Sequence, residues 1–331
     1  MTPSALPRPL TDRTPWVIIG ALAALNAMLW LVAVGAFAAR PALIGSALLA
    51  WLFGLRHAAD ADHLAAIDNV VRKLMQEGQR PYLTGLYFSL GHSAVVILAC
   101  AVIALTAFSG LIDSVRDVGG IFGTLVSAGF LVAIAALNLT VLLRLLRNDP
   151  TSDIQDHILA SRGLLARILH PAVRMIRRPA HMFPLGFLFG LGFDTASEVA
   201  LLALSATQAA AGLSCAQVLV FPTLFTAGMA LVDTADSVLM VGAYGWALRD
   251  PGRKRTYNVA ITGISVALAF GIGGIEAAGL LGDQFDLRGP VFSFIAMLND
   301  ASGHIGFGVI ALFLTLWAVS ACLQRRRTDE H

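Results

Sequence analysis

The chain has 331 residues and a formal net charge of +2, and 57% of its residues are hydrophobic while only 13% are charged. Soluble domains carry about 25% charged residues, so this composition, with a mean hydropathy of +0.74, excludes an ordinary soluble domain and indicates a polytopic membrane protein. The small net charge gives no reason to expect binding to nucleic acid, and the three separated cysteines form neither a CxxC pair nor a disulfide framework.

Eight apolar stretches are long enough to cross a bilayer, which takes about 20 residues. They lie at 16–38, 42–66, 82–108, 119–143, 183–207, 216–246, 257–281 and 304–323. The first is longer than the roughly 7–15 residues of a signal-peptide core, so we interpret it as a retained span. An α-helix forms all of its backbone hydrogen bonds within one segment, so it can cross the lipid without a partner strand. The sequence therefore predicts an all-α bundle of about eight transmembrane helices, forming a single domain over residues 1–331.

Lysine and arginine are distributed unevenly between the loops. The loops on the side of the N-terminus hold nearly all of them, whereas the opposite side holds only Arg40, Arg116 and Arg288. The positive-inside rule therefore predicts that both termini are cytoplasmic. The longest loop, 147–182, is basic and is expected to contact anionic lipid headgroups, with metal sensing by its three scattered histidines as the alternative.

Ionisable residues interrupt several of the predicted spans, beginning with the stretch RHAADADHLAAIDN at 56–69. Charged groups inside a bilayer are costly and usually mark a pathway or a site. The candidate metal residues are His57, Asp60, Asp62 and His63 in the second span, His92 in the third, Asp194 and Glu198 in the fifth, and Asp233 and Asp236 in the sixth.

Helical spacing gives these candidates an expected arrangement. In a continuous second helix His57 and Asp60 share a face, and His63 lies about one step further round it. Asp62 is expected to point away from this group, towards another helix. The acidic pairs of the fifth and sixth spans each lie about one turn apart, so each pair forms a polar ridge towards the bundle interior.

The predicted spans contain more acidic than basic groups, and this excess indicates what lies between the polar ridges. Six carboxyl groups in the second, fifth and sixth spans are opposed only by Arg56, which we expect to pair with a carboxylate such as Asp60. Such an excess requires protonated acids, water or a bound cation. Imidazole and carboxylate without thiolate suit a divalent first-row metal such as Ni²⁺, Co²⁺ or Zn²⁺. The alternatives are an interhelical hydrogen bond for His92 alone and a proton relay for Asp233 and Asp236.

Two parts of the chain resemble each other. FGLRHAADADHLAAI at 53–67 aligns with FGLGFDTASEVALLA at 189–203, and YFSLGH at 87–92 aligns with LFTAGM at 224–229. The shift of three spans predicts that the copies cross the membrane in opposite directions, as in inverted-repeat transporters with a site near the midplane. Chance similarity between apolar helices is the alternative.

Four motifs are similar to those of the nickel/cobalt transporter family. They are RHAADADHLAAIDN, LGHS, LGFDTASE and GMALVDTAD, and the first contains the family's H-x4-D-H signature as His57, Asp62 and His63. The resemblance implies an eight-helix permease for high-affinity uptake of Ni²⁺ and/or Co²⁺ across the cytoplasmic membrane. It also implies that the signature residues recognise the ion and that the remaining candidates complete its pathway, with the metal as substrate and no cofactor.

Two features of the sequence bear on this interpretation. Ala59 stands where the family often has a bulkier residue, and Ser93-Ala94 where it often has Ser-Thr, which bears on metal preference. No GxxxxGK[ST] motif is present, so we expect no ATP hydrolysis by this chain. No ATPase subunit is evident from the sequence, and the expected partners are the metal ion and the bilayer, with no nucleic acid. The alternatives are efflux of the same metals and, far less favoured because HExxH and histidine clusters are absent, an intramembrane metal enzyme.

Overall fold

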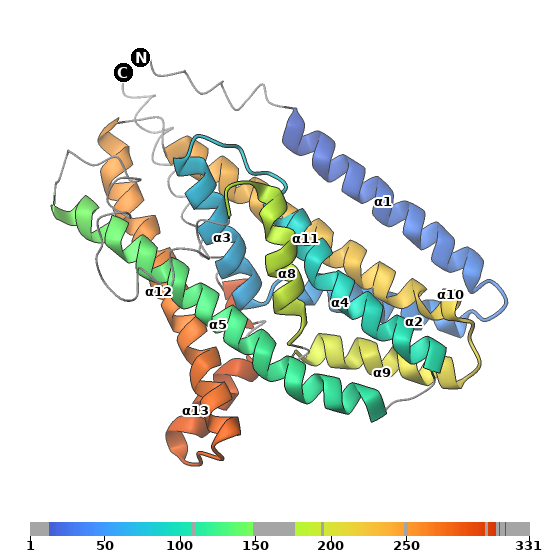
Figure 1. The fold of residues 1–331 in the computed structure, drawn as a ribbon. Helices are drawn as coiled ribbons and strands as arrows, with labels where there is room; N and C mark the ends of the chain where they lie inside the picture. Colours follow the sequence, from blue (N-terminus) through green and yellow to red (C-terminus); the bar gives the residue numbers. More distant parts are fainter. Residues whose placement is uncertain are drawn as a thin grey trace.

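The computed structural model describes residues 13–106, 110–147, 176–192, 195–247, 251–301 and 304–308, together with residues 311 and 315. Within these ranges the regular structure is helical throughout (Figure 1). The helices are α1 (Thr14–Ala36), α2 (Ala42–His57), α3 (Ala61–Gln76), α4 (Thr84–Thr106), α5 (Gly110–Arg147), the 3-10 turn η2 (Pro179–His181), α8 (Met182–Gly190), α9 (Ala196–Ala210), α10 (Cys215–Val218), α11 (Val220–Ala247), α12 (Pro251–Gln284) and α13 (Pro290–Asp300).

The helices confirm an all-α polytopic membrane protein. Five helical segments of the described chain are long and apolar enough to cross a bilayer, and a sixth span results if α2 and α3 count as one. The predicted fifth span, 183–207, is divided between α8 and α9. The predicted eighth, 304–323, lies mostly outside the described residues, so the number eight stays a prediction.

The distribution of polar and apolar side chains is reversed relative to a soluble protein. Leu31 on α1 is 74% exposed and Leu105 on α4 is 73% exposed, whereas His63, Asp233 and Ser237 are fully buried. Large exposed apolar surfaces mark contact with a membrane or a partner, and here they cover the outside of several long helices. The bundle therefore presents leucine to lipid and keeps its ionisable groups inside.

The second predicted span is not a continuous helix. The chain leaves the helix at Ala58–Asp60, and α3 continues at an angle of 52° to α2. Asp60 has extended backbone angles, φ −66° and ψ 144°, and stands at the N-cap position of α3. Aspartate is favoured at that position because its short polar side chain competes with helical backbone bonding. The prediction of one helix over 42–66 was therefore wrong.

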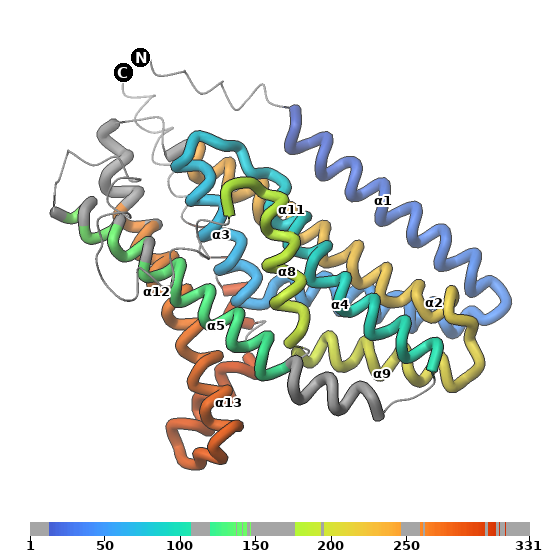
Figure 2. The backbone as a smooth tube through the Cα atoms, viewed as in Figure 1, coloured from blue at the N-terminus to red at the C-terminus, as the bar shows by residue number. Residues whose placement is uncertain are grey.

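A second interruption occurs in the copy of this segment. The chain leaves α8 after Gly190 and enters α9 at Ala196, and Thr195 at the N-cap has φ −91° and ψ 143°. Figure 2 shows α9 running at a pronounced angle to α8. Both interruptions lie at or shortly after the FGL triplets that begin the two aligned segments. The helices restart at Ala61 and Ala196, which are one position apart in the alignment, so the internal similarity extends to the restart of the helices.

The contacts between helices are also equivalent in the two copies of the repeat. α2 packs against α11, its counterpart α8 packs against α4, and α4 and α11 contact each other at the centre of the bundle. Glycine permits the two mirrored contacts: a Cβ on Gly54 of α2 would lie 2.0 Å from the carbonyl oxygen of Phe225, and one on Gly91 of α4 would lie 1.9 Å from that of Phe183. Such close backbone approach is typical of helix packing in membranes. This arrangement supports the predicted repeat, while the opposite membrane orientation of its copies stays a prediction.

Candidate metal centre

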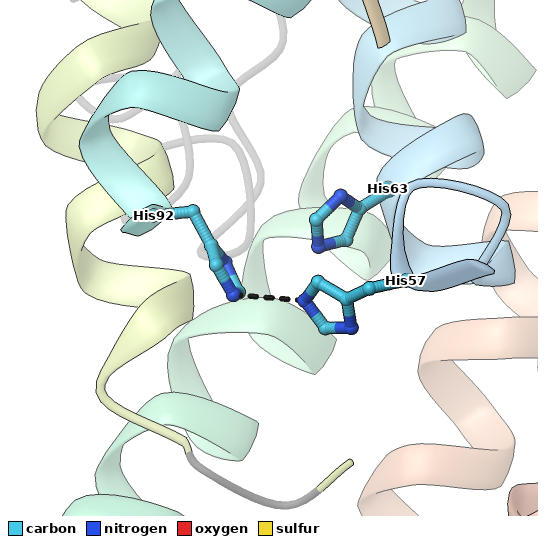
Figure 3. A group of neighbouring side chains, drawn as sticks. All are labelled: His57, His63 and His92. Atoms are coloured by element: carbon cyan, nitrogen blue, oxygen red, sulfur yellow. Dashed lines mark hydrogen bonds between the residues drawn. The ribbon is translucent and has the colours of Figure 1, made fainter. Parts of the chain in front are cut away.

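Three histidines from three helices meet inside the bundle. His57 ends α2, His63 lies in the first turn of α3, and His92 lies in the middle of α4. Figure 3 shows their rings facing one another, and one ring nitrogen from each lies within 4.8 Å of the others. All three are at most 3% exposed. The break between α2 and α3 lets His57 and His63 approach the same point from two helices.

The closest convergence involves His57, His92 and Glu198. His57 Nε2 lies 2.9 Å from His92 Nε2, and His92 Nε2 lies 2.8 Å from Glu198 Oε1. The distance from His57 Nε2 to Glu198 Oε1 is 4.0 Å. When two ligand atoms each lie about 2.0–2.1 Å from one ion and the ligand–ion–ligand angle is a right angle, the two atoms are about 2.9 Å apart. Two nitrogens and one oxygen are therefore already spaced as ligands of a single divalent ion.

The other nitrogen of His57 is surrounded by oxygen atoms. Nδ1 lies 3.1 Å from Asp60 Oδ2, 3.2 Å from Thr195 Oγ1 and 3.3 Å from Ser197 Oγ. An ionised Asp60 only accepts hydrogen bonds, and with such a partner Nδ1 carries the ring proton and donates a hydrogen bond to Oδ2. Such a partner fixes the tautomer and leaves the Nε2 lone pair for a metal. Of the predicted metal residues, Asp60 thus lies behind a candidate ligand histidine, on the side away from the convergence.

Arg56 takes the predicted role of counter-ion. Its Nη1 lies 3.8 Å from Asp60 Oδ2, and the same nitrogen donates a hydrogen bond to Ser197 Oγ at 3.3 Å. The guanidinium is partly exposed, with 33% of its side chain accessible. Arg56 therefore connects α2 to the first turn of α9 and balances the carboxylate behind His57.

Two acidic residues occupy equivalent places in the two copies. Asp62 lies in the first turn of α3 and Glu198 in the first turn of α9, and the alignment of the repeats pairs them with each other. Negative side chains are stabilised in the first turn of a helix, where unpaired N–H groups create a partial positive charge. Glu198 is buried and also accepts a hydrogen bond from Thr195 Oγ1 at 2.9 Å, whereas Asp62 is partly exposed. Both broken helices thus place an acidic side chain in the first turn of the helix that follows the break.

His63 and Asp233 extend the site along α11. His63 Nδ1 lies 3.6 Å from Asp233 Oδ2, and both residues are fully buried. Neither ring nitrogen of His63 and neither carboxylate oxygen of Asp233 has a hydrogen-bond partner, and Asp236 Oδ2, one turn further along α11, also has none. Buried charged groups are costly unless they are paired or contact a metal. These oxygens and nitrogens therefore fit a path that a cation occupies.

The predicted residue Asp194 lies outside the described residues. Thr195 and Ser197 were not among the sequence-based candidates, although they belong to the DTASE motif. Hydroxyl groups in membrane helices usually serve packing, so their type alone gave no signal.

A second buried polar network lies on α3 beyond the histidines. Asp68 accepts hydrogen bonds from Tyr244 on α11 and, at 2.7 Å, from Ser265 on α12. Asn69 accepts one at 2.5 Å from Asn138 on α5. Asn138 therefore makes a polar bond between helices, and α3 is connected by polar bonds to three other helices, α5, α11 and α12.

Comparison with known proteins places these residues in a family context. Residues 43–323 match the model of a family described as high-affinity nickel-transport protein. The chain is 53% identical to the hydrogenase nickel incorporation protein HupN of Bradyrhizobium diazoefficiens, over 94% of this chain and 84% of HupN. It is 51% identical to the high-affinity nickel transport protein of Cupriavidus necator, over 93% of this chain and 91% of that protein. It is 40% identical to the cobalt transport protein NhlF of Rhodococcus rhodochrous, over 91% and 89% of the two chains. No solved structure matches the chain significantly.

Replacing Asp60 tests its place behind His57. We expect Asp60→Asn to weaken Ni²⁺ binding by the purified protein about 10- to 100-fold, because the imidazole loses the acceptor that fixes its tautomer. The absorption spectrum of bound Co²⁺ should keep its shape, because the ligand atoms are unchanged. Calorimetric titration measures the first effect, and Asp300→Asn on the exposed end of α13 is the control. Binding of Asp60→Asn within twofold of the wild type would contradict this role.

Proposed function

The chain belongs to the family of high-affinity nickel-transport proteins, and on this premise we propose that it is a secondary transporter that carries Ni²⁺ and/or Co²⁺ into the cell across the cytoplasmic membrane. The observation that carries the proposal is the convergence of His57 Nε2, His92 Nε2 and Glu198 Oε1 inside a membrane bundle. The family is one of transporters, so the chain is not an enzyme.

The donor set suits these ions. Imidazole nitrogens and a carboxylate oxygen, with no cysteine among the described residues that meet at the centre, favour borderline divalent metals over Cu⁺, which prefers sulfur, and over Mg²⁺ or Ca²⁺, which prefer oxygen alone. His57, His92 and Glu198 would replace part of the ion's water shell, and His63, Asp62, Asp233 and Asp236 would contact it before or after that position. The same donors accept both Ni²⁺ and Co²⁺, so preference between them depends on how closely the helices hold the ligands.

Uptake has a sufficient driving force without ATP. A divalent cation that moves into a negatively charged interior gains about 4.6 kcal/mol per 100 mV. Coupling to protons, through carboxyl groups such as Asp233 or Asp236, is the alternative. Efflux is the less favoured direction, because the relatives include proteins named high-affinity nickel transport proteins.

Metal uptake tests the proposal directly. Cells starved of metal that express this chain should accumulate labelled Ni²⁺ in a saturable manner, and Co²⁺ should compete. His57→Ala, His92→Ala and Glu198→Gln should each reduce uptake at least tenfold, because each alanine removes a converging ligand nitrogen and the glutamine removes the negative charge of the converging oxygen. His181→Ala, which changes an exposed histidine, is the matched control. Wild-type accumulation by the three site variants, with equal protein in the membrane, would exclude this centre as the site.

The pH profile separates ion binding from proton coupling. Metal ligation requires neutral imidazole, whose ordinary pKa is about 6.5, so protonation at lower pH competes with the metal. We therefore expect uptake to decline as the external pH falls below about 6. The initial rate of labelled Ni²⁺ uptake between pH 5 and pH 8, at a fixed membrane potential, measures this. A rate that rises as the pH falls would favour inward proton coupling instead.

The orientation of the chain is part of the proposal. The distribution of arginine and lysine supports cytoplasmic termini and a cytoplasmic loop at 147–182. A reporter that is active in the cytoplasm should therefore be active when it is fused after residue 165, and a reporter that needs the periplasm should be inactive there. Activity of a periplasmic reporter such as alkaline phosphatase at this position would reverse the orientation.

A further inference from the structure

The start of the last described helix contacts the break between α2 and α3. Residues 304–308 are helical, and Gly306 is buried within them. A Cβ added to Gly306 would lie 1.6 Å from the carbonyl oxygen of Ala59, 2.7 Å from its carbonyl carbon and 3.3 Å from the amide nitrogen of Ala61. Of the described glycines, none shows a shorter distance. Gly306 therefore allows one backbone to lie directly on another.

The other side of this contact is made of small, fully buried residues. Ala58, Ala59 and Ala61 are 0%, 1% and 2% exposed. Because both partners are backbone, no flexible side chain can move aside to make room. The contact thus fixes the distance between residues 304–308 and the break.

The break has little support from its own capping residue. Backbone bonds from Ala59 N to Arg56 O, at 3.1 Å, and from Asp60 N to His57 O, at 2.9 Å, hold its α2 side. Asp60 stands at the N-cap of α3 but makes no side-chain cap bond, and its carboxylate is bound to His57 Nδ1 instead. The side chain that would normally stabilise the start of α3 is thus used at the metal centre, and a contact from outside the segment takes on more of the positioning.

We propose that Gly306 is a positioning residue for the metal centre: its backbone contact with Ala59 and Ala61 sets the relation between His57 at the end of α2 and His63 in the first turn of α3. The inference rests on the proposed function, because it names a residue that shapes the site of the transported ion. The atoms nearest to an added Cβ on Gly306 belong to the backbone of Ala59 and Ala61, so Gly306 acts through the break.

The expected effect is large because the contact is short. With alanine at 306, a separation of 1.6 Å must open to at least 3.4 Å, where ordinary contacts begin. Binding sites require their groups to be held within about 0.5 Å of the productive geometry. We therefore expect Gly306→Ala to weaken Ni²⁺ binding by about 10- to 100-fold, the range for residues that orient metal ligands.

The experiment compares three glycine variants of the full chain in detergent. Gly308→Ala is the matched control on the same helix, since nothing lies within 4 Å of its added Cβ. Gly279→Ala controls for a tight contact elsewhere, since its Cβ would lie 2.2 Å from Asn299 Nδ2 between α12 and α13. Calorimetric titration with Ni²⁺ should show weakened binding for Gly306→Ala alone. Binding within twofold of the wild type by Gly306→Ala would overturn the proposal.

A measurement without metal separates this inference from the proposed function. Amide hydrogen exchange over residues 57–64 should be faster in Gly306→Ala than in wild type and unchanged in Gly308→Ala, since the break loses its fixed position. Unchanged exchange would overturn the positioning role even if Ni²⁺ binding fell. Wild-type protein that binds no Ni²⁺ would instead contradict the proposed function and leave the exchange comparison valid.

A second variant covers the case in which Gly306→Ala does not fold. Ile305 packs against the core next to Gly306, and Ile305→Ala loosens residues 304–308 without a clash. We expect Ile305→Ala to weaken Ni²⁺ binding about three- to tenfold. This effect is smaller than that of Gly306→Ala because the backbone contact with Ala59 remains possible. Binding and exchange equal to wild type in Ile305→Ala would count against the positioning role.

Discussion

A buried imidazole presents a lone pair to a metal only if its other nitrogen keeps a proton, and in lipid that proton needs an acceptor. At His57 the acceptor is Asp60, three residues along the chain, with Nδ1 and Oδ2 3.1 Å apart. A regular helix through Asp60 would commit its backbone to α-helical geometry, whereas the observed extended conformation ends α2 and starts α3. The hydrogen bond and the helix break therefore occur together, and both direct Nε2 of His57 towards His92.

In the second copy of the motif, residues 189–203, an N-cap side chain is again bonded to residues of the site. Thr195 stands at the N-cap of α9, as Asp60 does at α3, and its hydroxyl contacts His57 Nδ1 and Glu198 rather than capping its own helix. Helix N-termini stabilise nearby negative charge, and Asp62 and Glu198 each lie in the first turn of the helix that restarts after an interruption. Of the two, Glu198 contacts His92 at the candidate centre.

The sequence predicted the members of the centre better than their arrangement. His57, His63, His92 and Glu198 could be found because ionisable groups in apolar spans are costly and rarely incidental. Their geometry was derived from one continuous helix, and Asp60 does not allow that helix. The role of Ser197 depends on distances between α2 and α9, far apart in the sequence, and hydroxyl groups in membrane helices carry no distinctive signal.

Metal preference shows why the arrangement of the residues matters in addition to their identity. The sequence has the small residue Ala59 where the resembled family often has a bulkier one, which bears on metal preference. In the structure Ala59 is 1% exposed within the break, with Gly306 against its carbonyl group. A larger side chain at this position has to be accommodated by α2, α3 and residues 304–308 together, because packed interiors leave little free volume. Under the proposed function, we therefore expect substitutions at residue 59 to change metal preference through the spacing of the helices that hold His57 and His63.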